Sequence, residues 1–176
     1  MSTAAVLWLM AGCSPAAQPA STRTVAAIEI PLKTNRDHDD LVAMLHRHAA
    51  ADGQDGIHVD DRTDEWLDLQ PQVEAMAPEE RGTIAVAVWR GADDASLEVL
   101  VQDWSHPGRA WLTFARGEPA ERSTRLREGL LADIHARWPD AQPLPLENGV
   151  IPLPGDLEAV DGAYRTIPSE AAKYVR

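Results

Sequence analysis

Three runs between positions 83 and 115, in which large apolar residues recur at every second position, restrict the possible folds more than any other feature of the sequence. Alternation with a period of two places successive side chains on opposite faces of a β-strand. Gly91-Ala92-Asp93-Asp94 separates the first two runs, and Pro107-Gly108 separates the second from the third, so both junctions resemble tight turns. The segment therefore predicts a three-stranded antiparallel meander.

The two turns also predict which residues pair across the meander. Both hairpins then place the same apolar side chains on one face, and we expect that face to form the core. The other face carries Glu98, Gln102 and Thr113 among its apolar residues. The expected pairs are Ile84–Val101, Val86–Val99 and Val88–Leu97 in the first hairpin, and Val101–Phe114, Asp103–Leu112 and Trp104–Trp111 in the second.

Two amphipathic helices flank the meander. Thr34 with Asp37 has the pattern of a capping box and predicts a helix that ends near Ala51. Pro119 is expected to be the first residue of a second helix, which Pro139 ends. The apolar residues at helical spacing are Leu41, Met44 and Leu45 in the first helix, and Leu126, Leu130, Leu131, Ile134 and Trp138 in the second.

Further strands are expected over residues 24–32, 57–60 and 141–146. The order of elements predicts an α+β fold with helices on one face of a mainly antiparallel sheet, a two-layer sandwich that is loosely ferredoxin-like. We expect this domain to span residues 23–146. Residues 147–176 place apolar side chains between Pro and Gly, which favours an extended C-terminal strap packed on the domain.

The N-terminus has the layout of a secretory signal. An uncharged apolar run leads through small residues to Cys13, and the run is too short to span a membrane, which takes about 20 apolar residues. Met10-Ala11-Gly12-Cys13 resembles the lipobox of bacterial lipoproteins. The resemblance implies that residues 1–12 are removed, that Cys13 carries lipid, and that residues 13–22 form a tether in the cell envelope. Ser14 is not the Asp of an inner-membrane retention signal, so outer-membrane attachment facing the periplasm is expected.

The single cysteine and the net charge of −12 limit the remaining possibilities. A lipidated Cys13 leaves no thiol for a disulfide, a redox centre or a cysteine metal site. An acidic surface repels nucleic acid and favours a basic protein partner. We therefore expect no cofactor, no nucleic acid, and membrane contact through the lipid.

The candidate functional surface is the second face of the meander, with Trp89, Leu100, Trp104 and Trp111. Aromatic side chains with scattered polar groups are typical of protein contact surfaces. The alternative is that the first helix or the C-terminal strap covers these residues and makes them core.

Histidines and carboxylates between His38 and Asp60 are the other candidate site. His46 and His48 lie two apart on a helix and point to different sides, and His58 and Asp60 share a strand face without a third ligand. Turn chemistry accounts for Ser105 and its neighbours. We assign no catalytic or metal-binding residue.

The sequence favours a protein-binding lipoprotein without catalysis, such as an envelope assembly factor or an immunity-like protein. One alternative is a hydrolase or metal-dependent enzyme that uses His and Asp of residues 38–60. Another is a carrier of a small apolar ligand, with a pocket between the sheet and the strap.

Overall fold

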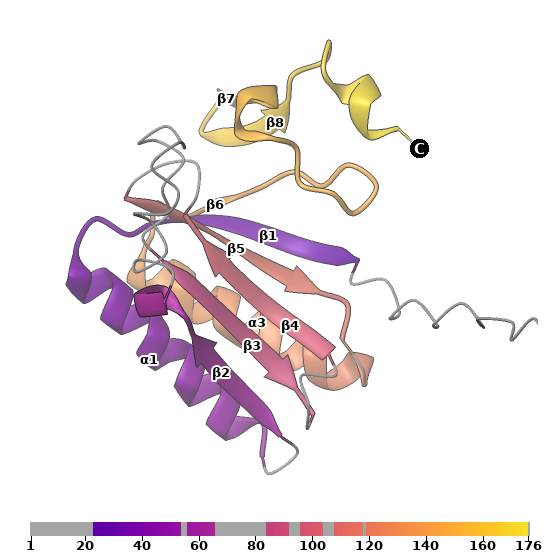
Figure 1. Ribbon diagram of the computed structural model, residues 1–176. Coiled ribbons are helices and arrows are strands. Elements are labelled where there is room, and N and C mark those ends of the chain that lie inside the picture. Colours follow the sequence, from indigo (N-terminus) through magenta and orange to yellow (C-terminus); the bar gives the residue numbers. More distant parts are fainter. Residues whose placement is uncertain are drawn as a thin grey trace, which may run out of the picture.

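The structure is a computed structural model that describes residues 23–53, 56–65, 84–91, 96–103, 108–117 and 119–175. Six strands form the main sheet in the order β2-β3-β4-β5-β1-β6, and every neighbouring pair is antiparallel (Figure 1). A second sheet contains β7 and β8. The elements are β1 (Thr24–Pro31), α1 (Asn35–Ala51), β2 (Ile57–Asp61), β3 (Ala85–Arg90), β4 (Ser96–Gln102), β5 (Arg109–Ala115), α3 (Ala120–Arg137), β6 (Gln142–Pro143), β7 (Leu157–Val160) and β8 (Ala163–Thr166), with the 3-10 turns η4 (Pro154–Asp156) and η5 (Ala171–Tyr174).

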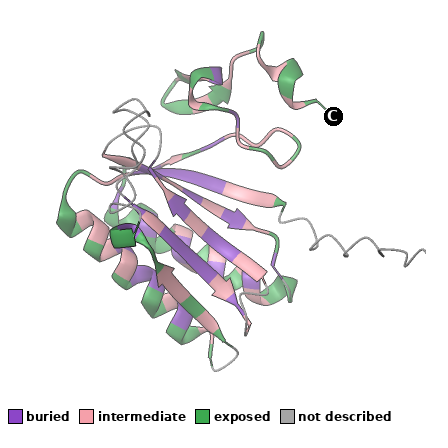
Figure 2. Ribbon diagram, viewed as in Figure 1, coloured by how far each residue is buried: buried purple, intermediate pink, exposed green. Residues whose placement is uncertain are grey.

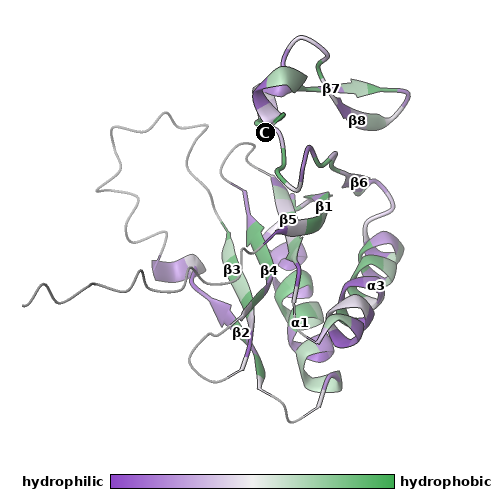
Figure 3. Cartoon of the chain, turned by 90° about the vertical axis from the view of Figure 1, so that its right-hand side faces the viewer, coloured by the Kyte–Doolittle hydropathy of each residue, from purple (hydrophilic) through white to green (hydrophobic). Residues whose placement is uncertain are grey.

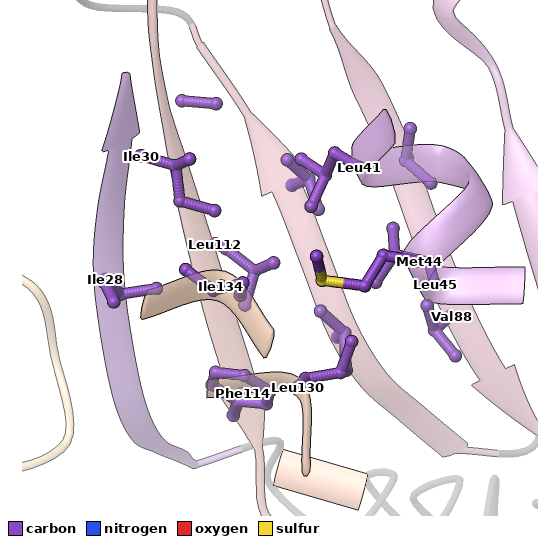
Figure 4. Packing of buried hydrophobic residues seen from close by; sticks show 14 of the residues in the cluster. Ile28, Ile30, Leu41, Met44, Leu45, Val88, Leu112, Phe114, Leu130 and Ile134 are labelled. Atoms are coloured by element: carbon purple, nitrogen blue, oxygen red, sulfur yellow. The ribbon is translucent and has the colours of Figure 1, made fainter. Parts of the chain in front are cut away.

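Both long helices lie on the same side of the main sheet (Figure 3). Between the two layers, Phe114 of β5 packs with Leu130 and Ile134 of α3, and none of the three is more than 2% exposed (Figure 4). Burying an aliphatic or aromatic side chain of this size contributes about 1.5–3 kcal/mol. The α+β class and its two-layer arrangement are therefore confirmed, and the meander packs on α3 as expected.

The start of α1 has the capping box that the sequence predicts. The Thr34 hydroxyl accepts a hydrogen bond from the Asp37 N–H at 3.2 Å, and the Asp37 carboxylate accepts one from the Thr34 N–H at 3.0 Å. Asp37 also accepts a hydrogen bond from Arg137 at the end of α3, at 2.9 Å. At the other end, His48 of α1 lies 3.0 Å from Asp133 of α3. These contacts hold the two helices side by side in opposite directions.

Two element boundaries differ from the prediction. Pro119 is the cap residue of α3 and not its first helical residue, which is Ala120. Of the strand expected over residues 141–146, only Gln142 and Pro143 form β6. Proline lacks the N–H that a ladder needs, so Pro143 and Pro145 limit this edge strand to one short pairing with β1.

The predicted registers of the meander were wrong by two residues in each hairpin. Val101 faces Val86 and Leu112, while Val99 faces Val88 and Phe114. The connections are longer than their turn residues suggested, because β4 begins only at Ser96 and already ends at Gln102. A shift of two residues keeps each side chain on the same face, so the valines and Phe114 still form the core. Gln102 takes the place opposite Trp111 that was expected for Trp104.

Because of a β-bulge in β4, two residues lie on the opposite faces of the sheet from those predicted. After Val88 the pairing shifts by one residue, so that Trp89 lies opposite Leu97. Leu97 was expected in the core and instead shares the face of Trp89. Glu98 was expected on that face and instead lies on the helix side, where it is 2% exposed.

Glu98 belongs to a buried network of charges that joins the sheet to both helices. Its carboxylate accepts hydrogen bonds from Arg90 of β3 at 2.7 Å and from Ser123 of α3 at 2.9 Å. Arg90 also donates to Asp52 at the end of α1, at 2.6 Å, and Arg122 of α3 donates to the same carboxylate at 3.0 Å. Removing one partner of such a buried pair typically costs about 3–5 kcal/mol, because the other charge stays buried.

The C-terminal segment, residues 147–175, folds around Asp156. The Asp156 carboxylate accepts hydrogen bonds from the Tyr174 hydroxyl at 2.5 Å and from Lys173 at 2.9 Å. These two donors hold the pKa of Asp156 below its ordinary value. The backbone carbonyl of Asp156 accepts from the Ile167 N–H at 2.8 Å. The segment contains the β7–β8 hairpin and is therefore not extended throughout.

The fold predicts unequal costs for the same change at two leucines. Leu112 is fully buried, and Leu112→Ala should lower the free energy of unfolding by about 2–5 kcal/mol, because it leaves a cavity. Leu153 is 65% exposed, and Leu153→Ala should change that energy by less than about 0.5 kcal/mol. Urea unfolding measures both, and equal effects would contradict the proposed core.

Candidate functional site

The candidate site predicted from the sequence lies on the face of the main sheet opposite the helices. We call this face the second face. Most of its residues are half-buried, and Figure 2 shows them alternating with buried residues along the central strands. Cross-strand pairing arranges it in the rows Trp89–Leu97, Ala87–Leu100–Thr113 and Gln102–Trp111–Glu29.

A buried carboxylate is the centre of one end of this face. Glu29 of β1 is 3% exposed and accepts hydrogen bonds from the Trp111 indole at 3.0 Å and from the Tyr164 hydroxyl at 2.9 Å. Arg109 of β5 donates to the same carboxylate. The bond to Glu29 raises the pKa of Arg109, and burial with the Glu29 carboxylate raises the pKa of Tyr164. Because Tyr164 belongs to β8, the C-terminal segment docks on the second face here.

The four residues predicted to bind a partner have different surroundings. Trp111 is half-buried and its indole N–H is held by Glu29, so it belongs to this docking contact. Trp89 and Leu100 are half-buried on β3 and β4, and Leu100 pairs with Thr113, two residues along β5 from Trp111. The Trp89 indole N–H is buried and has no hydrogen-bond partner in the described ranges. Trp104 lies outside the described residues.

The histidines between residues 38 and 60 do not converge. His46 is exposed, while His48 turns toward α3 and contacts Asp133. His58 and Asp60 share a strand face, as predicted, and lie opposite Trp89 and Ala87 of β3. Across the described residues, no group of three or more His, Cys, Asp or Glu side chains is placed to hold a metal ion.

A cleft of about 820 Å³ lies between the start of α1 and the end of β2 and contains His38, Asp61 and Thr63. His38 Nε2 is 3.4 Å from the Thr63 hydroxyl and 4.0 Å from the Asp61 carboxylate. Proton abstraction needs about 2.6–3.2 Å between the heavy atoms. The Thr63 hydroxyl is buried and already accepts a hydrogen bond from the Ala85 N–H at 3.2 Å. These contacts fix the end of β2 against β3.

A second cleft, of about 430 Å³, lies where the C-terminal segment leaves the sheet. Asn148 and Gly149 of the segment line it, with Leu146 just before the segment and Arg23 and Arg116 beside the ends of β1 and β5. A carrier of apolar ligands needs a mainly hydrophobic lining. The two arginines make this cleft suitable for an anion instead.

The Glu29 cluster is the part of the site that sequence reasoning missed. One signal was available, because Glu29 stands between Ile28 and Ile30 and a strand with both isoleucines in the core must turn the carboxylate to the second face. Its partners Arg109 and Tyr164 lie 80 and 135 residues further along the chain. Local patterns contain no information on such distant contacts.

Comparison of the chain with known protein families, with curated proteins and with solved structures found no match. The fold and the geometry of the site are therefore the basis for assigning a function. Among the described helices, none is both long and apolar enough to cross a membrane. Cys13 and the expected signal and tether lie outside the described residues.

The Tyr164 contact predicts how the C-terminal segment is held. Tyr164→Phe keeps the ring and removes the hydroxyl that donates to Glu29, a charged acceptor, so it should cost about 1.5–3 kcal/mol. Hydrogen exchange should become faster in β7 and β8 and stay unchanged in β3 and β4. Ser169→Ala is the control and should leave exchange in β7 and β8 unchanged, because it removes an exposed hydroxyl of the segment that bonds Glu170 and not Glu29. Unchanged exchange in Tyr164→Phe would show that other contacts hold the segment.

Proposed function

We propose that the protein is a lipoprotein of the bacterial cell envelope that faces the periplasm and acts by binding another protein. The observation that carries this proposal is the row of half-buried apolar side chains on the second face, at Trp89, Leu97 and Leu100. Their neighbours Val88 and Val99 pack in the core on the helix side, so these three residues lie on the other face of the sheet. Both long helices are on the opposite side of the sheet (Figure 3). Apolar and aromatic groups in such a position are suited to a partner surface.

The lipid anchor is proposed from the sequence. Met10-Ala11-Gly12-Cys13 resembles a lipobox, and Cys13 is the single cysteine of the chain. A signal peptide over residues 1–12 and a lipidated tether over residues 13–22 would leave the folded domain at the membrane surface. Ser14 after the cysteine favours the outer membrane.

The charge of the chain favours a basic partner. The net charge is −12. Complementary charge speeds association and selects against acidic partners such as nucleic acids. An envelope assembly factor or an immunity-like protein against a toxin would both bind proteins in this way.

The two alternatives have less support. For an enzyme using residues 38–60, the described histidines and carboxylates do not form a group of three that could hold a metal ion. A carrier of an apolar ligand would need a hydrophobic pocket beside the C-terminal segment, where the cleft instead contains Arg23 and Arg116. Protein binding is the function to test first.

The anchor predicts the location of the protein in the cell. Cys13→Ser removes the thiol that would carry the lipid, so the variant should lose lipid labelling and move from the membrane fraction to the soluble fraction. Ser14→Ala is the matched control and should stay in the membrane fraction. Membrane association of Cys13→Ser equal to that of the unchanged protein would contradict the anchor.

The second face predicts the effect of truncating its apolar residues. Trp89→Ala combined with Leu100→Ala should weaken co-purification of a partner by at least about tenfold, because central aromatic contacts commonly contribute 2 kcal/mol or more. Circular dichroism and urea unfolding report whether the double variant is folded. Val42→Ala on α1, which is half-buried on the helix side, serves as the control. A folded double variant that keeps its partner would contradict the proposed surface.

A further inference from the structure

The large hydrophobic side chains that are exposed in the described ranges all belong to the C-terminal segment. Val150 is 53% exposed, Leu153 is 65% exposed and Val175 is 73% exposed. Isolated exposed aliphatic residues are common on soluble proteins, but a group of them marks a contact surface.

Hydrogen bonds bring the three residues into one region around Tyr174. The Asn148 amide donates to the Tyr174 carbonyl at 2.8 Å, and the Leu153 N–H donates to the Tyr174 hydroxyl at 2.9 Å. Val150 closes the tight turn that contains Asn148, since its backbone exchanges hydrogen bonds with Glu147 at 2.9 and 3.0 Å. Val175 follows Tyr174 directly.

This region borders the point where the described chain begins. A Cβ atom on Gly149 would lie 2.7 Å from Cγ of Arg23, so the arginine side chain packs directly on the turn before Val150. The Arg116 N–H donates to the Arg23 carbonyl at 2.9 Å, and both arginines line the cleft of about 430 Å³. Figure 1 shows the start of β1, the loop after β6 and the C-terminal end on the same side of the molecule.

The arginines and the carboxylates of this region differ in whether they already have partners. Arg23 and Arg116 are exposed, and neither guanidinium makes an ion pair within the described part of the chain. Most nearby carboxylates already have donors. The pairs are Glu147 with Thr166, Asp156 with Lys173 and Tyr174, Glu158 with Arg165, and Glu170 with Lys173.

The proposed anchor would hold this region close to a membrane. Cys13 precedes Arg23 by ten residues, and ten residues span at most about 35 Å when fully extended. A tether of this length keeps the start of β1 at a high local concentration of lipid headgroups. The membrane is therefore the surface that the start of β1 would meet most often.

We propose that Val150, Leu153 and Val175, together with Arg23 and Arg116, form a membrane-facing patch that rests on the anionic lipid surface. The aliphatic side chains enter the interfacial layer, and the two guanidinium groups contact headgroup phosphates. Buried apolar area and attraction to anionic lipid add together in such contacts. The inference rests on the proposed lipid anchor and adds to it a fixed orientation of the domain.

The test uses the lipidated full-length protein in vesicles. Because lipid occupies the Cys13 thiol, a cysteine introduced elsewhere is the single free thiol and can carry the fluorophore NBD. Val150→Cys and Leu153→Cys report on the patch, and Ala43→Cys, exposed on α1, is the control. The vesicles contain phosphatidylcholine and phosphatidylglycerol with nitroxide-labelled lipid. NBD at both patch positions should be quenched at least about twofold, and NBD at Ala43→Cys should not be quenched.

A second variant separates the electrostatic contribution to the membrane contact from the apolar contribution. Arg23→Gln with Arg116→Gln should reduce the quenching on anionic vesicles and leave it unchanged on pure phosphatidylcholine. Flotation of the vesicles records anchoring independently of orientation. Flotation without quenching at the patch, or with equal quenching at Ala43→Cys, would overturn the patch and leave the anchor intact. Loss of flotation would overturn the anchor and the patch together.

Discussion

A single sheet has two faces, and the two long helices of this protein lie on only one of them. On that face, Leu112 and Phe114 are buried against α1 and α3, and this core supplies most of the apolar burial of the fold. The second face is completed by other means: small side chains such as Ala87, the Glu29 cluster, and the β8 residue Tyr164 that reaches it. Trp89 and Leu100 stay half-buried there, so the uneven covering of the sheet is the physical basis of the proposed binding surface.

The bulge in β4 affects both faces. It turns Glu98 into the helix layer, where Arg90 and Ser123 hydrogen-bond it, and it places Leu97 beside Trp89 on the second face. A regular strand would bury Leu97 and expose Glu98. The buried network thus joins β3, β4 and both helices at one end of the core, while the same shift in pairing extends the apolar row of the second face.

Local patterns in the sequence predicted the α+β class, the capping box of Thr34 and the core face of the meander. They failed on the register of the strands, on the bulge in β4 and on contacts between residues far apart in the chain. The register was wrong because loop lengths were inferred from turn residues, and a shift of two residues leaves no trace in the alternation. The roles of Glu29 and Tyr164 were missed because 135 residues separate them. The alternating pattern gives no sign of the bulge that turns Glu98 to the helix side.

The proposed anchor, the membrane-facing patch and the second face together describe a domain that is held at a membrane in one orientation and binds a protein with its sheet. In-cell photo-crosslinking tests this most directly, with a photoreactive amino acid at Gln102 on the second face or at Ala132 on the exposed side of α3. The account predicts one discrete crosslinked partner from Gln102, absent when Trp89 is changed to Ala, and none from Ala132. Crosslinking from Ala132 alone, or none from Gln102, would contradict it.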